Sequence, residues 1–212
     1  MSNLIVGIID YGMGNMRSVQ NSLNEIDVNS VIVADPDKLS NYDALILPGV
    51  GAFDVAMSNL RQSGMDSALS EAVEQGKILL GICLGMQLIC GDSLENGAHT
   101  GLGYISAHVL PFPTSSEFKV PHMGWNSITQ NKPHPVYDNI ENNADVYFVH
   151  SFHVECKIEE DVIGVTDHGI LFASIVLHEN VIGMQFHPEK SQRTGLKLLS
   201  NIFIENTMEH AC

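Results

Sequence analysis

The segment with the clearest chemical character is Gly81-Ile82-Cys83-Leu84-Gly85, which joins an apolar run to a stretch of helical pattern. Flanking glycines permit the tight turn of a nucleophile elbow, which lifts the central side chain above the strand ends. At a helix N-terminus, unpaired N–H groups and the helix dipole favour a thiolate. We therefore expect Cys83 to act as a nucleophile. The competing interpretation is a buried cysteine that serves only as a small apolar residue.

A thiol nucleophile needs a base, and the segment at 185–189, Gln-Phe-His-Pro-Glu, offers one. In an extended segment His187 and Glu189 point to the same face, and Pro188 favours that conformation at His187. Glu189 could then accept a hydrogen bond from one imidazole nitrogen while the other faces the sulfur. A surface turn with a solvated Glu189 is the alternative.

Glycines also follow a second apolar run, in Pro48-Gly49-Val50-Gly51. Ligands of open α/β sheets bind beyond the carboxyl ends of the strands, where glycines let backbone N–H groups approach. The N–H of Val50 or Gly51 could join that of Leu84 in an oxyanion hole, worth about 3 kcal/mol per donor. A plain loop is the alternative.

The elements that must position these residues alternate between strands and helices in the first half of the chain. Such alternation indicates βαβ units and a parallel sheet. We expect strands at 4–10, 29–34, 43–48 and 77–82, and helices at 16–26, at 53–75 with a break near Gly64, and from 84 onward. Shorter strand-like runs follow at 103–110, 118–128, 146–156, 161–166, 171–177 and 181–186, and a final helix at 191–209. The sequence thus predicts one α/β domain over 1–212, with a mostly parallel central sheet flanked by helices and a mixed or antiparallel extension.

Composition excludes several classes of function. The chain has 212 residues with 25 acidic and 10 basic side chains, a net charge of -15, which disfavours binding to nucleic acid or an anionic membrane surface. The longest uncharged apolar run, between Lys77 and Asp92, is shorter than the roughly 18 residues of a membrane span. The N-terminus lacks a basic segment typical of secretion signals, so we expect a cytoplasmic protein.

The four cysteines, at 83, 90, 156 and 212, have no C-x-x-C spacing, so we expect neither a metal site nor a disulfide framework. Cys90 has no glycine frame and is expected in the core. We expect no cofactor.

Taken together, these segments resemble the class I glutamine amidotransferases, and more narrowly the glutaminase subunits of imidazole glycerol phosphate synthase. The matching strings run in order along nearly the whole chain: IIDYGMGN (8–15), LPGVGAF (47–53), GICLGMQL (81–88), GLG (101–103), VPHMGWN (120–126), YFVHSF (147–152) and GMQFHPEKS (183–191). The resemblance implies the family's fold, with its nucleophile elbow, and hydrolysis of glutamine to glutamate and ammonia by a Cys83-His187-Glu189 triad. It implies glutamine-binding roles for Gln87, Glu95, His150, Ser151 and Phe152, and an oxyanion site completed by Val50 and Gly51.

The resemblance also implies a partner, a (β/α)8-barrel synthase subunit that receives the ammonia in a heterodimer. The barrel subunit would make imidazole glycerol phosphate and an aminoimidazole carboxamide ribotide. Positions matching the partner interface are Met13, Asn15, His122, Trp125, Asn126 and Tyr147. Trp125, the only tryptophan, lies in a Gly-Trp-Asn context that looks exposed, and tryptophan is favoured at interface centres.

Some positions depart from that pattern. Phe152-His153 replaces a run that usually contains tyrosine and so removes a hydroxyl. Phe118-Lys119 and the segment at 153–156 resemble a sister branch that supplies ammonia to a related barrel enzyme of cell-surface sugar synthesis. That branch, with the same glutaminase chemistry, is the first alternative. A catalytically idle scaffold on this fold is the second, although it would lack a triad member.

Overall fold

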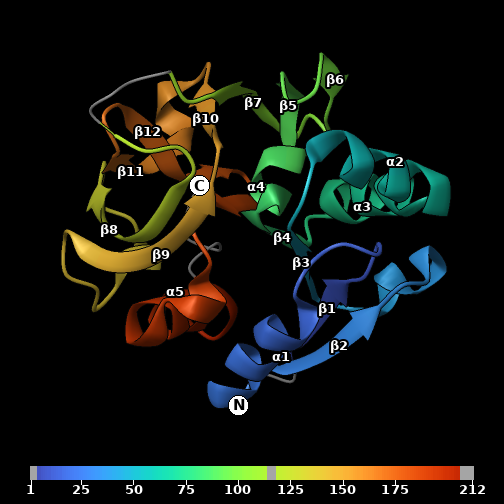
Figure 1. The fold of residues 1–212 in the computed structure, drawn as a ribbon. Helices are drawn as coiled ribbons and strands as arrows, with labels where there is room; N and C mark the ends of the chain where they lie inside the picture. Colours follow the sequence, from blue (N-terminus) through green and yellow to red (C-terminus); the bar gives the residue numbers. More distant parts are fainter. Residues whose placement is uncertain (1–3, 114–117, 206–212) are drawn as a thin grey trace.

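The computed structural model of the chain describes residues 4–113 and 118–205. In the first half, four strands pair in parallel in the spatial order β2-β1-β3-β4. These strands are β1 (Ile5–Ile9), β2 (Asn29–Val33), β3 (Ala44–Gly49) and β4 (Ile78–Cys83). They are connected by α1 (Met16–Glu25), the 3-10 helix η1 (Pro36–Asn41), α2 (Phe53–Ser63) and α3 (Met65–Glu74) (Figure 1). The predicted break between the last two helices is confirmed, with Gly64 in the left-handed conformation at a φ of 75°.

The second half extends this sheet. β13 pairs in parallel with β4, and the neighbouring strands β12 and β10 add antiparallel pairs, as the sequence predicted for a mixed extension. The remaining strands are β5 (Cys90–Ser93), β6 (His99–Thr100), β7 (Ile105–Pro111), β8 (His122–Gln130), β9 (Ala144–His150), β10 (Phe152–Cys156), β11 (Val162–Asp167), β12 (Leu171–His178) and β13 (Val181–Met184). The remaining helices are α4 (Leu84–Leu88), α5 (Gln192–Phe203) and the 3-10 turns η2 (Pro135–Tyr137), η3 (Glu159–Asp161) and η4 (Pro188–Lys190).

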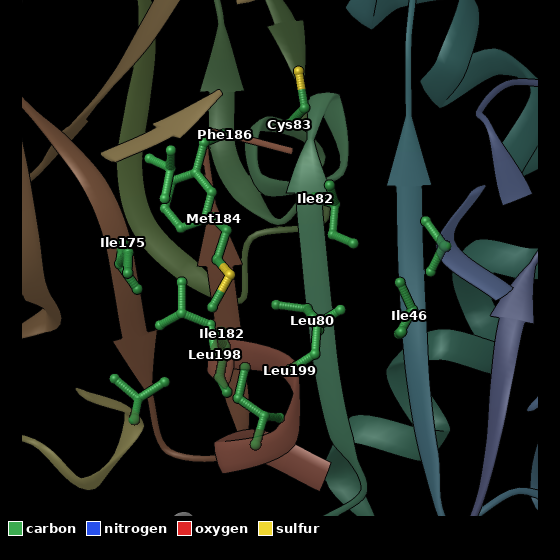
Figure 2. Close-up of a cluster of buried hydrophobic side chains, with 14 of the residues drawn as sticks. Ile46, Leu80, Ile82, Cys83, Ile175, Ile182, Met184, Phe186, Leu198 and Leu199 are labelled. Atoms are coloured by element: carbon green, nitrogen blue, oxygen red, sulfur yellow. The ribbon is translucent and has the colours of Figure 1, made fainter. Parts of the chain in front are cut away.

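Apolar side chains cover both faces of the parallel strands. This is expected for a sheet between two helical layers, because successive side chains of a strand point to opposite faces. On β3, Ile46 belongs to the cluster that contains α1 and α5 side chains, whereas Leu45 and Leu47 belong to the cluster that contains α2, α3 and α4 side chains. Figure 2 shows the first cluster, with Leu198 and Leu199 of α5 beside β4 and β13.

Several boundaries differ from the sequence prediction; for example, the strand expected at 118–128 lies at His122–Gln130. The run at 146–156 forms two strands, because His150 still pairs with β8 whereas Phe152 begins to pair with β7. The helix after the elbow ends at Leu88, and the short strands β5 and β6 follow it; they carry polar residues that gave no strand pattern. The final helix ends at Phe203, while the rest of its predicted range beyond 205, and Cys212, lie outside the described residues. Within residues 4–113 and 118–205, no helix has the length and apolar character needed to cross a membrane.

Candidate active site

Cys83 stands at the turn between β4 and α4, as the G-x-C-x-G sequence predicts. Its backbone has a φ of 54° and a ψ of -107°, a strained conformation for a residue with a Cβ, which costs on the order of 1–3 kcal/mol. A Cβ on Gly81 would lie 2.6 Å from the Gly85 carbonyl oxygen, and one on Gly85 would overlap the Leu47 carbonyl oxygen. Both glycines are therefore required, because the elbow packs its own backbone against β3. Figure 2 shows the Cys83 sulfur beyond the end of β4.

His187 and Glu189 follow β13, the strand beside β4. His187 Nδ1 lies 2.8 Å from Glu189 Oε1, and both side chains are almost fully buried. The predicted pair forms, although not along one extended segment: His187 is extended, with a φ of -98° and a ψ of 96°, and Pro188 then begins the 3-10 turn η4. The backbone N–H of His187 donates to the Tyr147 carbonyl, 2.9 Å away, and so ties this turn to β9.

The protonation of His187 reflects its neighbours. Burial acts to lower the pKa of His187, but the nearby Cys83 sulfur and Glu189 carboxylate together outweigh burial and raise the pKa to about 9. Among the described residues, Nε2 of His187 has no hydrogen-bond partner, and the Cys83 thiol points at the Val149 carbonyl oxygen, 3.7 Å away. His187 is therefore placed to exchange a proton with the sulfur, as a base beside a thiol nucleophile must be.

Sulfur and imidazole line one cavity of about 390 Å³ at the carboxyl ends of β3, β4 and β13. Its volume suits a small ligand such as an amino acid. Every residue predicted for the oxyanion site and for glutamine binding contributes to the wall. The lining residues are Val50, Gly51, Cys83, Leu84, Gln87, Glu95, Pro121, Val149, His150, Ser151, Phe152 and His187.

Comparison with known proteins agrees with this geometry. The family model described as glutamine amidotransferase class-I matches residues 7–206. The chain belongs to the class I glutamine amidotransferases. It is 49% identical over 200 residues to the imidazole glycerol phosphate synthase subunit HisH of Sulfurimonas denitrificans, covering 93% of this chain and 96% of that protein. It is 46% identical over 200 residues to the subunit of the same name from Wolinella succinogenes, covering 93% and 98%.

Solved structures show the same fold at low sequence identity. The structure of PurLQS from Thermotoga maritima has a TM-score of 0.74 at 20% identity, covering 95% of this chain and 98% of that one. A structure titled crystal structure of glutamine amidotransferase has a TM-score of 0.72 at 20% identity, covering 94% and 97%. The predicted amidotransferase-like α/β fold is therefore confirmed.

A buried amide chain leads from the cavity wall of this amidotransferase to the sulfur. Gln87 Nε2 donates to the Phe152 carbonyl at 3.2 Å and to Gln185 Oε1 at 3.1 Å. Gln185 Nε2 in turn lies 3.9 Å from Cys83 Sγ. Sequence reasoning assigned Gln185 no role. The only signal was its place at the end of an apolar run. The structure buries it fully, and a buried amide must find polar partners.

Glu95 reaches the cavity from the loop after β5. Its Oε2 accepts from the Phe53 N–H, 2.9 Å away, at the N-terminus of α2. Burial raises the pKa of Glu95 and outweighs this hydrogen bond, which acts to lower it. The carboxylate is thereby fixed at the cavity, where it could face the ammonium group of an amino acid.

The residues predicted for a partner interface divide into separate groups. Trp125 and Tyr147 lie opposite each other on the outer face of the β8–β9 hairpin, with ring centroids 5.9 Å apart. His122 is buried on the reverse face, and Asn126 bonds to His122 and to the Asp167 carbonyl. His122 therefore faces the protein interior, while Asn126, on the same face of β8, is only half-buried.

Two further interface predictions fall in the turn between β1 and α1. Met13 lies against Gly51, since a Cβ there would be 2.6 Å from Met13 Cε. Asn15 caps α1 by accepting from the Ser18 N–H at 3.3 Å. Among the residues that the structure describes, no group of three or more His, Cys, Asp or Glu side chains is arranged to hold a metal ion.

Proposed function

We propose that the chain is the glutaminase subunit of an imidazole glycerol phosphate synthase, which hydrolyses glutamine and supplies the ammonia to a (β/α)8-barrel subunit. The observation that carries the glutaminase chemistry is that Cys83 and His187 line one amino-acid-sized cavity, while Glu189 bonds to the far nitrogen of His187. The acceptor is inferred from the relatives named as HisH, which match nearly their full length.

In the proposed reaction, the Cys83 thiolate attacks the side-chain amide carbon of glutamine. The resulting oxyanion is stabilised by the N–H of Leu84 and by an N–H of Val50 or Gly51. Protonated His187 gives its proton to the leaving nitrogen, so ammonia departs and a glutamyl thioester remains. His187, now neutral, takes a proton from water as the water attacks the thioester. The C–S bond then breaks, which regenerates the Cys83 thiolate beside protonated His187, and glutamate leaves after its new carboxyl group loses its proton to solvent.

Glutamine itself would be held by the rest of the wall. A zwitterionic amino acid presents an ammonium and a carboxylate, and the cavity offers the Glu95 carboxylate to the first and backbone groups at 150–152 to the second. Gln87 lines the cavity, and Gln185 lies behind it, bonded to Gln87 and 3.9 Å from the Cys83 sulfur. The phosphate-bearing acceptor would bind only to the barrel subunit, which agrees with the net charge of -15 on this chain.

The test uses the complex of this chain with the barrel subunit of the same organism, comparing the wild-type chain, Cys83→Ala and the control Cys156→Ser. Cys156 is a partly buried cysteine of β10 that does not line the cavity. We expect Cys83→Ala to form no glutamate and to lose glutamine-dependent imidazole glycerol phosphate synthesis, while synthesis from added ammonium salt persists. Glutamate formation by Cys83→Ala would overturn the nucleophile assignment. Failure of the wild-type complex to make imidazole glycerol phosphate from either nitrogen source would overturn the acceptor.

A further inference from the structure

Tyr11 contacts the proposed oxyanion segment, residues 48–51, although sequence reasoning gave it no role. Its side chain is 5% exposed, and its hydroxyl donates to the Pro48 carbonyl oxygen at 2.9 Å. Pro48 begins the segment 48–51, whose residues Val50 and Gly51 line the cavity. The Tyr11 hydroxyl thus holds the carbonyl group of Pro48, the first residue of this segment.

The hydroxyl also lies beside the elbow. A Cβ on Gly49 would lie 2.7 Å from the Tyr11 hydroxyl oxygen and 2.8 Å from Leu84 Cβ. Gly49 is the register partner of Cys83 in the β3–β4 pair. The phenol, the start of the oxyanion segment and the elbow are therefore packed in direct contact, with no room for a side chain between them.

The tyrosine is itself anchored. Asn59 Nδ2 of α2 donates to the Tyr11 carbonyl at 3.1 Å. Two residues on, Met13 packs against Gly51, which has a φ of 106°. The turn at 11–13 therefore contacts the segment 48–51 near both of its ends.

Burial keeps the Tyr11 hydroxyl protonated, so that it remains a hydrogen-bond donor. Burial, and to a smaller extent the nearby Cys83 sulfur, raise the pKa of Tyr11 above its ordinary value. The phenol therefore stays protonated throughout the neutral range, and its hydrogen bond to Pro48 does not depend on the charge state of the site.

We propose that Tyr11 is a positioning residue of the oxyanion site, which holds the Pro48 carbonyl so that the amides of Val50 and Gly51 stay at the cavity wall opposite Leu84. The proposal rests on the proposed glutaminase function. Tyr11 does not touch the reacting atoms. It restricts the segment that does, so its loss should reduce stabilisation of the transition state more than binding of glutamine.

The test compares Tyr11→Phe with Tyr137→Phe, each in complex with the barrel subunit. Tyr137 is a matched control, because it is also 5% exposed and donates to a backbone carbonyl at 2.9 Å, that of Ile163, away from the cavity. We expect Tyr11→Phe to lower kcat for glutamine hydrolysis about tenfold, less than the loss of an oxyanion donor itself, with KM changed less than about twofold. Tyr137→Phe should retain the wild-type kcat.

A second measurement separates the oxyanion site from the thiol. Iodoacetamide alkylates a thiolate without an oxyanion site, whereas a chloroketone analogue of glutamine places its carbonyl oxygen there. Tyr11→Phe should react with iodoacetamide at the wild-type rate and with the chloroketone about tenfold more slowly. An unchanged kcat, or equal slowing by both reagents, would overturn the role of Tyr11. If the wild-type complex forms no glutamate, the glutaminase proposal fails instead.

Discussion

His122 Nδ1 lies 2.9 Å from His150 Nε2 on the buried face of the β8–β9 hairpin. His150 Nδ1 lies 2.8 Å from the Phe152 carbonyl oxygen, and Asn126 Nδ2 lies 3.2 Å from His122 Nε2. Because a carbonyl oxygen only accepts, His150 carries its proton on Nδ1 and accepts at Nε2 from the Nδ1–H of His122. Both imidazoles are thereby assigned as neutral Nδ1–H tautomers.

The first prediction concerns the pH dependence of stability. Burial, with the neighbouring His168, lowers the pKa of His122 to about 4. Burial, with smaller effects of His122, His168 and His153, lowers that of His150 to about 3 against the opposing hydrogen bond to Phe152. Both histidines protonate near pH 6.5 when the chain is unfolded, so the unfolded state binds more protons below that pH. The free energy of unfolding should fall with acid, by at most about 1.4 kcal/mol per pH unit for each histidine.

The measurement is urea unfolding from about pH 6.5 to about pH 4. His122→Asn should show a shallower pH dependence than the wild type. His99→Asn, on the surface strand β6, should keep the wild-type slope. Equal slopes in all three proteins would show that His122 is not held neutral by its surroundings.

The second prediction concerns the elbow. Gly85→Ala should lower the free energy of unfolding by about 3 kcal/mol or more, because the added Cβ would overlap the Leu47 carbonyl and displace β3 from α4. Gly76→Ala is the control: Gly76 has a φ of 80°, and no atom of the described residues lies within 4 Å of an added Cβ. Only backbone strain applies there, a cost of about 1–2 kcal/mol. Calorimetric unfolding of both variants decides the matter, and equal losses would mean that the elbow relaxes around the methyl group.

The elbow also shows which features the sequence could predict. Gly81, Cys83 and Gly85 act within one turn, so their spacing alone indicated the strained geometry. Apolar runs likewise indicated the buried parallel strands, because each run is read locally. The His187–Glu189 pair was predicted for the same reason, although the 3-10 turn after Pro188 replaced the expected extended segment.

Contacts between distant segments could not be read in this way. Gln185 bonds to Gln87 across 98 positions, and Tyr11 bonds to Pro48 across 37. Neither residue has a local pattern that names its partner. The inward direction of His122 could not be read from the sequence, because it depends on which face of β8 packs against the core. The alternation of His122 and Asn126 with Met123 and Trp125 would by itself place the apolar side chains inward, the reverse of what the structure shows.

The third prediction concerns Glu189. Glu189→Gln should lower kcat for glutamine hydrolysis at least about 100-fold, because an amide cannot stabilise the His187 imidazolium. Folding raises the pKa of His187 from about 6.5 to about 9. The stabilisation that the protonated His187 gives to the folded state is therefore fully present below about pH 6.5 and is lost as the pH rises through about 9. The variant should lose much of this pH dependence.

Asp92→Asn provides the control for Glu189→Gln. Asp92 also pairs with a histidine, His108, at 2.7 Å, but on the partly exposed β5–β7 pair outside the cavity. Its kcat should equal that of the wild type. A Glu189→Gln variant with the kcat of Asp92→Asn would exclude the proposed orienting role.

The fourth prediction concerns the outer face of the β8–β9 hairpin. Trp125 is 50% exposed and Met123 62% exposed on this face, which lies on the reverse side of the strand from buried His122. Large apolar side chains left exposed on a rigid hairpin indicate a docking surface, and tryptophan commonly dominates binding energy there. If this surface binds the proposed barrel subunit, Trp125→Ala should weaken the complex by about 2 kcal/mol or more, roughly a 30-fold rise in Kd. The measurement is a calorimetric titration of each variant with the barrel subunit. Val31→Ala, at a 43% exposed position on the distant edge strand β2, should leave Kd unchanged. Equal affinities of the two variants would place the interface elsewhere.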